Sequence, residues 1–249
     1  MIPSFYRLRE VAVTASTNAD AKQAAEAGEP EGLVIQALSQ TSGRGRQGRV
    51  WESPDGNIYA SVLLRPRCLP LEVGYYSFVT ALAVYDAVHE FLPQARIELK
   101  WPNDVLVGGK KISGILLEAA PIEKGLVDWL VIGVGVNVRH FPENALYPAT
   151  SLLAEGADAS VPLVLENLLK YLLIWQDRLK NDGFEPVRIA WLGQARKGAL
   201  TARLPQEVLE GTFSDLDRQG NLILQLADGS ERAIAAADVY FPNASQACC

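Results

Sequence analysis

The pattern of the sequence changes near Arg196, and this change constrains the fold more than any other feature. Before it, apolar strand-like runs are interspersed with long helical segments. After it, only short strand-like runs remain, separated by turn signals such as RQGN and ADGS. A mixed order of helices and strands followed by strands alone predicts an α+β domain over residues 1–195 and a small β-barrel-like domain over residues 196–249.

Hydrophobic periodicity and punctuation predict the elements of the first domain. Helices are expected at residues 15–28, 71–92, 161–180 and 184–195, and strands at residues 32–40, 57–66, 97–101 and 128–138. Residues 105–119 predict a hairpin that turns at Gly108 and Gly109.

Composition and charge exclude several classes of function. The 249 residues carry a net charge of −6, which argues against DNA or RNA as the main partner. There is no apolar run of about 18 residues and no signal peptide at the start of the chain, so we expect a cytoplasmic protein without a membrane span. The two histidines and the cysteines lack zinc spacing, and Cys248 and Cys249 are expected in an exposed tail.

Against this acidic background, the stretch GRGRQGR gathers Arg44, Arg46 and Arg49 in a loop too rich in glycine for a helix. Glycines let backbone N–H groups approach a ligand, and arginines pair with phosphate or carboxylate oxygens. The loop lacks the Gly-Lys-Ser/Thr ending of a P-loop and does not open a helix as a dinucleotide fingerprint does. It predicts a local anion site, with a solvated surface loop as the alternative.

A second stretch, LKWPNDVLVGGKKISGILLEA, brings Lys100, Asn103, Asp104 and Lys111 within twelve residues. One carboxylate, that of Asp104, suits Mg²⁺ bound with a phosphate substrate. Lys111 could place its charge between a carboxylate and a phosphate, and Gly114 would leave room for a ligand. The alternative is a surface hairpin with paired charges.

Two further motifs carry weaker signals. In VIGVGVN, Gly133 and Gly135 weaken a strand unless something lies close to it, and Asn137 could hydrogen-bond a ligand; a tightly packed core strand is the alternative. In STN, Ser16 or Thr17 predicts a helix N-cap, which does not exclude ligand contact.

Taken together and in this order, STN, Q-x-x-G-R-G-R-x-G-R, KWPND, K-x-x-G-I-L-x-E and G-x-G-x-N resemble the bacterial biotin protein ligases. The match runs from about residue 14 to residue 138. The resemblance implies a mixed central sheet with helices, followed by an SH3-like C-terminal domain. Some members of that family carry an N-terminal helix-turn-helix domain; here STN begins at residue 16, so we expect the type that acts only as an enzyme.

The resemblance also implies residue roles. It assigns catalysis to Lys111, Arg46 and Asp104, with Asp104 as the metal ligand. It assigns biotin contact to Ser16, Thr17, Asn18 and Gln40, and closure over biotin and the adenylate to Arg44, Gly45 and Arg46. Asn103 lies near ATP, Trp51 near the adenine, and Asn137 near the ribose or phosphate. Substrate binding is further expected to involve Arg49, Lys100 and Gly114.

The implied reaction has two steps. Biotin and ATP, with Mg²⁺, form biotinyl-5'-AMP, and a lysine of the biotin carboxyl carrier protein of acetyl-CoA carboxylase then takes the biotinyl group. Relatives can pair through sheet edges, so a homodimer is compatible with the sequence. The open alternatives are a lipoate or octanoate ligase of the same superfamily and a non-catalytic module that binds biotin or a nucleotide.

Overall fold

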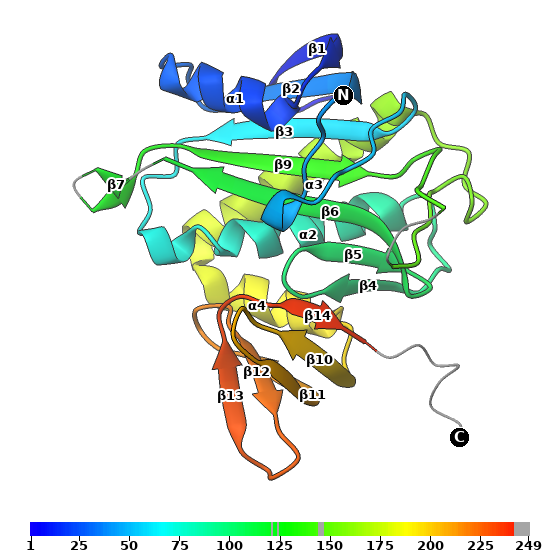
Figure 1. Ribbon diagram of the computed structural model, residues 1–249. Coiled ribbons are helices and arrows are strands. Elements are labelled where there is room, and N and C mark those ends of the chain that lie inside the picture. Colours follow the sequence, from blue (N-terminus) through cyan, green and yellow to red (C-terminus); the bar gives the residue numbers. More distant parts are fainter. Residues whose placement is uncertain (121, 124, 144–146, 242–249) are drawn as a thin grey trace.

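A computed structural model describes residues 1–120, 122–123, 125–143 and 147–241 (Figure 1). The expected tail with Cys248 and Cys249 lies outside these residues. A seven-stranded sheet in the order β1-β2-β3-β9-β6-β5-β4 forms the main body. Its strands are β1 (Arg7–Thr14), β2 (Leu33–Gln40), β3 (Ile58–Leu64), β4 (Ile97–Lys100), β5 (Asp104–Val107), β6 (Lys110–Ala119) and β9 (Leu130–Val136).

The sheet is mixed, as expected. β1 and β2 run parallel, and every other neighbouring pair in this sheet is antiparallel. The β5–β6 hairpin turns at Gly108 and Gly109, whose φ angles of 56° and 78° lie in the left-handed region that favours glycine. A short two-stranded ribbon, β7 (Ile122–Glu123) with β8 (Leu126–Val127), extends beyond β6.

Helices cover both faces of the sheet, which explains why β3 is buried along its whole length. The helix α1 (Thr17–Glu26) packs on one face, against a small core that includes Ala21, Ile35 and Val131. The helices α2 (Tyr75–His89), α3 (Val161–Asp182) and α4 (Phe184–Gly193) cover the other face (Figure 1). No helix among the described residues is long and apolar enough to cross a membrane.

The C-terminal strands form a second, antiparallel sheet in the order β13-β12-β11-β10-β14. They are β10 (Ala199–Arg203), β11 (Val208–Leu216), β12 (Leu222–Gln225), β13 (Glu231–Ile234) and β14 (Asp238–Tyr240). The small β-domain is therefore present. The boundary between residues 195 and 196 stays a prediction, and it falls in the connection between α4 and β10.

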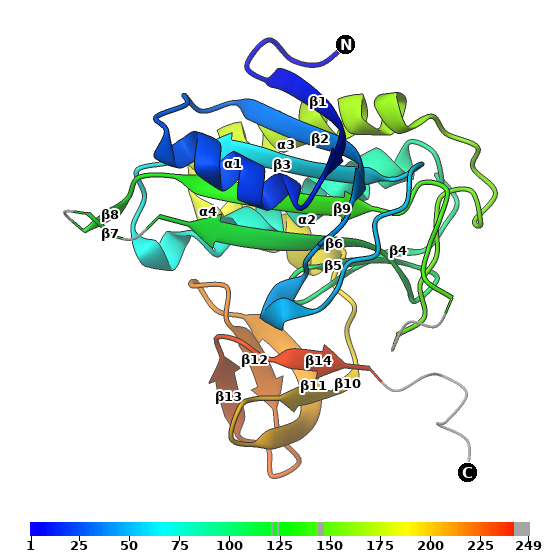
Figure 2. The same cartoon turned by 45° about the horizontal axis from the view of Figure 1, so that its top comes forward.

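The two sheets share one hydrophobic core. Phe78 of α2 and Trp191 of α4 pack edge to face, and Trp191 in turn contacts Phe213 of β11. The indole N–H of Trp101 donates a hydrogen bond of 3.1 Å to the carbonyl of Gly220. The smaller sheet is therefore fixed against the end of the larger one (Figure 2).

The four helices and the strands predicted for the main sheet are confirmed, but β1 was not predicted. β1 is an edge strand with no fully buried residue. Without a buried face it lacks the hydrophobic alternation by which a strand is recognised in a sequence.

Candidate active site

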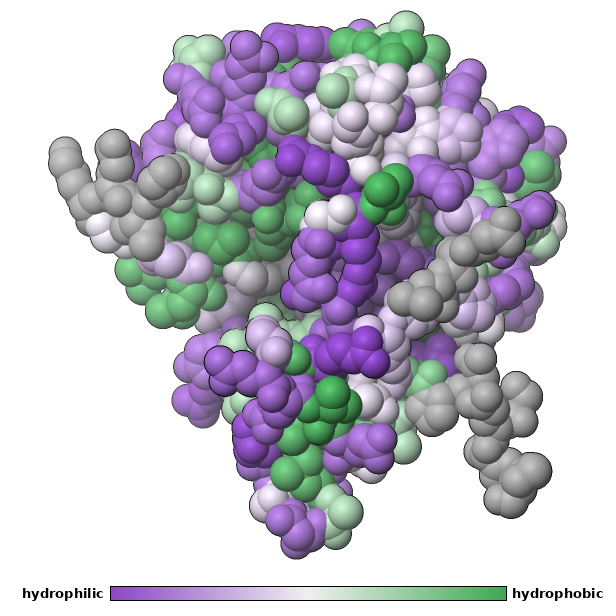
Figure 3. Space-filling model, viewed as in Figure 1, coloured by the Kyte–Doolittle hydropathy of each residue, from purple (hydrophilic) through white to green (hydrophobic). Residues whose placement is uncertain are grey.

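A cavity of about 300 Å³ opens where β6 and β9 face the arginine loop (residues 43–50) and the smaller sheet. Hydrophilic side chains gather around this hollow between the main body and the smaller domain (Figure 3). Every site residue predicted from the sequence lines it: Ser16, Thr17, Asn18, Gln40, Arg44, Gly45, Arg46, Arg49, Trp51, Lys100, Asn103, Asp104, Lys111, Gly114 and Asn137.

One end of the cavity is a hydrogen-bonded network of polar side chains, of which Thr17, Asn18 and Ser61 are buried. Gln40 accepts a hydrogen bond of 2.9 Å from the backbone N–H of Thr17, at the start of α1. Ser61 lies 2.8 Å from the Thr17 hydroxyl and donates to Asn18 Oδ1 at 2.6 Å, because an amide oxygen can only accept. Asn18 Nδ2 donates to Glu118 at 2.8 Å. These contacts fix the orientation of both amides.

Glycines on the central strands make room for the side chains above them. A Cβ at Gly133 would lie 2.2 Å from Asn18 Oδ1, and a Cβ at Gly135 would lie 2.5 Å from the Trp51 ring. The Trp51 indole N–H is buried and has no hydrogen-bond partner among the described residues. An unpaired buried donor is costly, so an acceptor atom of a ligand would be stabilised there.

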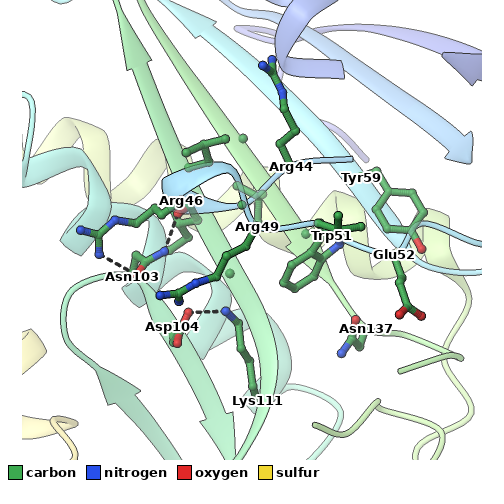
Figure 4. A pocket seen from close by; sticks show the side chains of 18 of the residues that line it. Arg44, Arg46, Arg49, Trp51, Glu52, Tyr59, Asn103, Asp104, Lys111 and Asn137 are labelled. Carbon is green, nitrogen blue, oxygen red and sulfur yellow. Dashed lines mark hydrogen bonds and ion pairs between the residues drawn. The ribbon is translucent and has the colours of Figure 1, made fainter. Parts of the chain in front are cut away.

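The other end of the cavity holds one carboxylate between two ammonium groups. Asp104 Oδ1 lies 2.5 Å from Lys111 Nζ (Figure 4). Asp104 Oδ2 lies 3.5 Å from Lys100 Nζ. Burial alone would raise the pKa of Asp104, but the two lysines outweigh it and hold the pKa below its ordinary value. Burial lowers the pKa of Lys100. The β5–β6 hairpin brings Asp104 and Lys111 together because it is so short.

The arginine loop closes on itself as a tight turn, with Gly45 N donating to Arg49 O at 2.7 Å. Its three guanidinium groups diverge. Arg46 donates to Asn103 Oδ1 at 3.2 Å, Arg49 pairs with Asp238, and the Arg44 side chain points away from the Lys111–Asp104 pair (Figure 4). Burial lowers the pKa of Arg46. Three arginines that lie within six residues of one another thus have side chains in different surroundings.

The cavity is positive in a negatively charged chain. Its lining contains five cationic side chains (Arg44, Arg46, Arg49, Lys100 and Lys111) and three carboxylates (Glu52, Asp104 and Asp238), an excess of two positive charges. Such a site attracts anions. Several converging N–H donors replace the water molecules that a phosphate or carboxylate gives up when it binds.

These residues do not fit a resident Mg²⁺ ion. Both oxygens of Asp104 face ammonium groups. Within the described part of the chain, no group of three His, Cys, Asp or Glu residues could hold a metal. The role of Asp104 as a metal ligand stays a prediction. A single carboxylate is compatible only with a Mg²⁺ ion whose other ligands come chiefly from the phosphates of the substrate.

Several lining or supporting residues were missed by sequence reasoning. Ser61 lies within an apolar strand, so no signal marked it. Glu118 stands in the K-x-x-G-I-L-x-E motif but was given no role. Asp238 and its neighbours Ala237 and Val239 also line the cavity, although they lie far beyond the motifs. Asn57 accepts three backbone hydrogen bonds from residues 138–140 and so holds the loop that follows Asn137.

Comparisons with known proteins find relatives that match most of the chain. Residues 10–137 match the biotin/lipoate A/B protein ligase family, and residues 200–241 match the biotin protein ligase C terminal domain. The biotin–[acetyl-CoA-carboxylase] ligase of Paracoccus denitrificans is 38% identical over 93% of this chain and 99% of its own length. The ligase of the same name from Mycobacterium tuberculosis is 35% identical over 94% of this chain and 88% of its own length.

Among solved structures, the biotin protein ligase from Aquifex aeolicus in complex with biotin and ATP superposes with a TM-score of 0.79 at 27% identity. That likeness covers 94% of this chain and 97% of the other. The first family match covers every sequence motif that lines the cavity, and the second covers the C-terminal strand β14. The chain therefore belongs to the biotin/lipoate A/B protein ligase family.

Proposed function

We propose that this chain is an ATP-dependent biotin protein ligase. It activates biotin as biotinyl-5'-AMP and transfers the biotinyl group to a lysine of the biotin carboxyl carrier protein of acetyl-CoA carboxylase. The observation that carries the proposal is a single cavity with two unlike ends. One end is a polar hydrogen-bonding network on α1 and β3, and the other is a cationic cluster on the β5–β6 hairpin and the arginine loop.

In the first step, a carboxylate oxygen of biotin attacks the α-phosphorus of ATP, and the bond to pyrophosphate breaks. Two anions must approach each other, so positive charge has to offset their repulsion. Lys111 and Arg46 are the groups placed to do this, since Lys111 faces the cavity over Gly114 and Arg46 reaches across to Asn103. Mg²⁺, when carried by ATP, would supply further charge neutralisation.

In the second step, the ε-amine of the carrier lysine attacks the acyl carbon, forming an amide and releasing AMP. The incoming amine has to lose a proton. Asp104 is poorly suited to accept it, because two ammonium groups lower its pKa and thus make it a weaker base than a free carboxylate. Asp104 serves better to orient Lys111.

The polar end of the cavity favours biotin over lipoate or octanoate. The ureido ring of biotin carries two N–H donors and one carbonyl acceptor, which can pair with Thr17, Asn18 and Gln40. An apolar chain has no donor or acceptor for these polar groups, and a site built to hydrogen-bond its substrate discriminates against an analogue that lacks such groups. Biotin is therefore the better substrate for this site.

ATP–pyrophosphate exchange, run in parallel with biotin, lipoate and octanoate, tests the proposal. We expect exchange with biotin and a requirement for added Mg²⁺. Exchange with lipoate or octanoate instead would overturn the substrate. No exchange with any of the three acids would favour a non-catalytic binding module.

Transfer is tested with a carrier protein and its target-lysine-to-arginine variant. Both have the same overall charge, but only the first has a nucleophilic amine. We expect a covalent biotinyl product with the first alone. Labelling of both carriers would show release of a diffusible acylating agent in place of directed transfer.

A further inference from the structure

The last strand of the smaller sheet forms part of the cavity wall. Ala237, Asp238 and Val239 line it, and β14 lies directly below the turn of the arginine loop (Figure 2). β14 is itself held by antiparallel pairing with β10, in a sheet fixed to the main body through the shared core. It is thus a firm support rather than a mobile tail.

A direct contact joins this support to the loop. Arg49 forms an ion pair with Asp238, whose side chain is only 18% exposed, whereas that of Arg49 is 47% exposed. The loop is a small unit, because Gly45 N bonds to Arg49 O and Arg49 N bonds to Arg46 O. Holding Arg49 therefore also holds Arg46, which contacts Asn103.

A second contact from the same strand reaches the opposite rim. The Tyr240 ring lies 5.3 Å from the Tyr147 ring, and Lys100 Nζ lies 5.0 Å above the Tyr147 ring. Lys100 in turn faces Asp104. The strand β14 thus touches both the loop and the surroundings of the cationic cluster.

We propose that Asp238 is a positioning residue that latches the arginine loop over the cavity through Arg49. The role rests on the proposed function, since the purpose of the latch is to keep biotinyl-5'-AMP away from water until the carrier lysine arrives. Asp238 does not act on reacting atoms. It shifts the loop toward its closed position, and the loop then shields the anhydride.

The expected effect is moderate, because a partly exposed ion pair changes an open-to-closed equilibrium by roughly fivefold. Asp238→Asn should therefore lose biotinyl-5'-AMP about fivefold faster than wild type in the absence of carrier. Amide hydrogen exchange at residues 44–50 should rise by a similar factor in the free protein. Asp238→Glu, which keeps the charge, should restore part of both.

The test compares wild type, Asp238→Asn, Asp238→Glu, Arg49→Gln and the double variant Arg49→Gln/Asp238→Asn. The control is Glu207→Gln, which breaks an ion pair with an equally exposed arginine, Arg232, in the same domain but away from the cavity; Glu207 itself is more exposed than Asp238. If the two residues act as one latch, the double variant loses adenylate no faster than the worse single variant.

Three results would overturn the latch: exchange at residues 44–50 unchanged in Asp238→Asn, adenylate loss within twofold of the Glu207→Gln control, or multiplied effects in the double variant. Failure of the wild type to make biotinyl-5'-AMP would instead overturn the proposed function. Hydrogen exchange on the free protein still decides the latch in that case.

Discussion

At the scale of single residues, Lys111 is the group whose loss should affect the first step most. It is the ammonium nearest to Asp104 and faces the cavity beside Gly114. Removing one positioned donor costs about 3 kcal/mol of transition-state stabilisation, so Lys111→Ala should slow adenylation roughly 100-fold or more. ATP–pyrophosphate exchange with biotin measures this.

Lys110, the residue before Lys111, provides the matched control. Lys110 pairs with Glu155 and does not line the cavity. Lys110→Ala should therefore stay within about threefold of wild type, since exposed ion pairs contribute little. Equal losses in the two variants would show that the effect reflects the hairpin rather than the charge of Lys111.

The hydrogen-bond network around Asn18, at the other end of the cavity, requires that residue 133 has no side chain. Gly133 has an ordinary φ, so alanine is allowed by the backbone, but its Cβ would lie 2.2–2.9 Å from three atoms of the Asn18 amide. Gly133→Ala should displace Asn18 and raise the KM for biotin about tenfold or more, because a lost hydrogen bond to a buried group costs about 1–3 kcal/mol.

The KM for ATP separates local from general damage. It should change less than twofold in Gly133→Ala if the disturbance stays at the Asn18 end. Gly193→Ala is the control, since an added Cβ there meets no atom within 4 Å. A similar rise in both KM values would contradict the assignment of this end to biotin.

These residues also show how far the sequence alone could lead. Asp104 and Lys111 were predicted together because a hairpin brings close neighbours in sequence close in space. Ser61 and Asp238 could not be found that way, since their proximity to the cavity depends on sheet order and on the packing of two sheets. The divergence of Arg44, Arg46 and Arg49 was equally hidden, because side-chain direction in an irregular loop follows from its tertiary partners.

At the scale of elements, the arginine loop combines a self-contained turn with few contacts to the body. Its backbone bonds run mainly within residues 43–51, and its side-chain hydrogen bonds and ion pairs to the rest of the described residues are those of Arg46 and Arg49. A segment with so few external contacts opens locally at low cost. Ligand phosphates that pair with its arginines should therefore close it.

Hydrogen exchange measured with and without biotin plus ATP checks this. Amides at residues 43–49 should exchange at least tenfold more slowly with both ligands, since a bound ligand stabilises the closed loop by mass action. Amides of α3, on the far face of the sheet, serve as the internal reference. Equal exchange at residues 43–49 in the free and bound protein would contradict the lid role.

Element-scale prediction from the sequence succeeded where burial was strong. The fully buried run of β3 and the glycine-rich β9 were predicted because apolar content marks central strands. The exposed edge strand β1 was missed for the opposite reason. Element type thus followed from hydrophobicity, whereas the register and order of the sheet required the structure.

At the scale of the whole molecule, the change of pattern near Arg196 predicts two domains, but the structure joins them through one core. Phe213 of β11 is 5% exposed and packs against Trp191 of α4, and Leu99 of β4 exchanges backbone bonds with the segment that leads to β10. Sheets that share a core unfold together, because neither can lose its partner without exposing apolar surface.

Phe213→Ala tests this coupling. Truncating a buried phenylalanine costs about 3–5 kcal/mol, so the midpoint of thermal unfolding should fall by roughly 10 °C. Because the core is shared, calorimetry should show one transition at the lower temperature, with equal calorimetric and van't Hoff enthalpies. Val208→Ala, at a site 56% exposed on the same strand, should shift the midpoint by less than about 2 °C. Two separate transitions, with only the smaller one shifted by Phe213→Ala, would mean that the C-terminal sheet folds as an independent unit. Its support of the arginine loop would then depend on docking of two domains rather than on a common core.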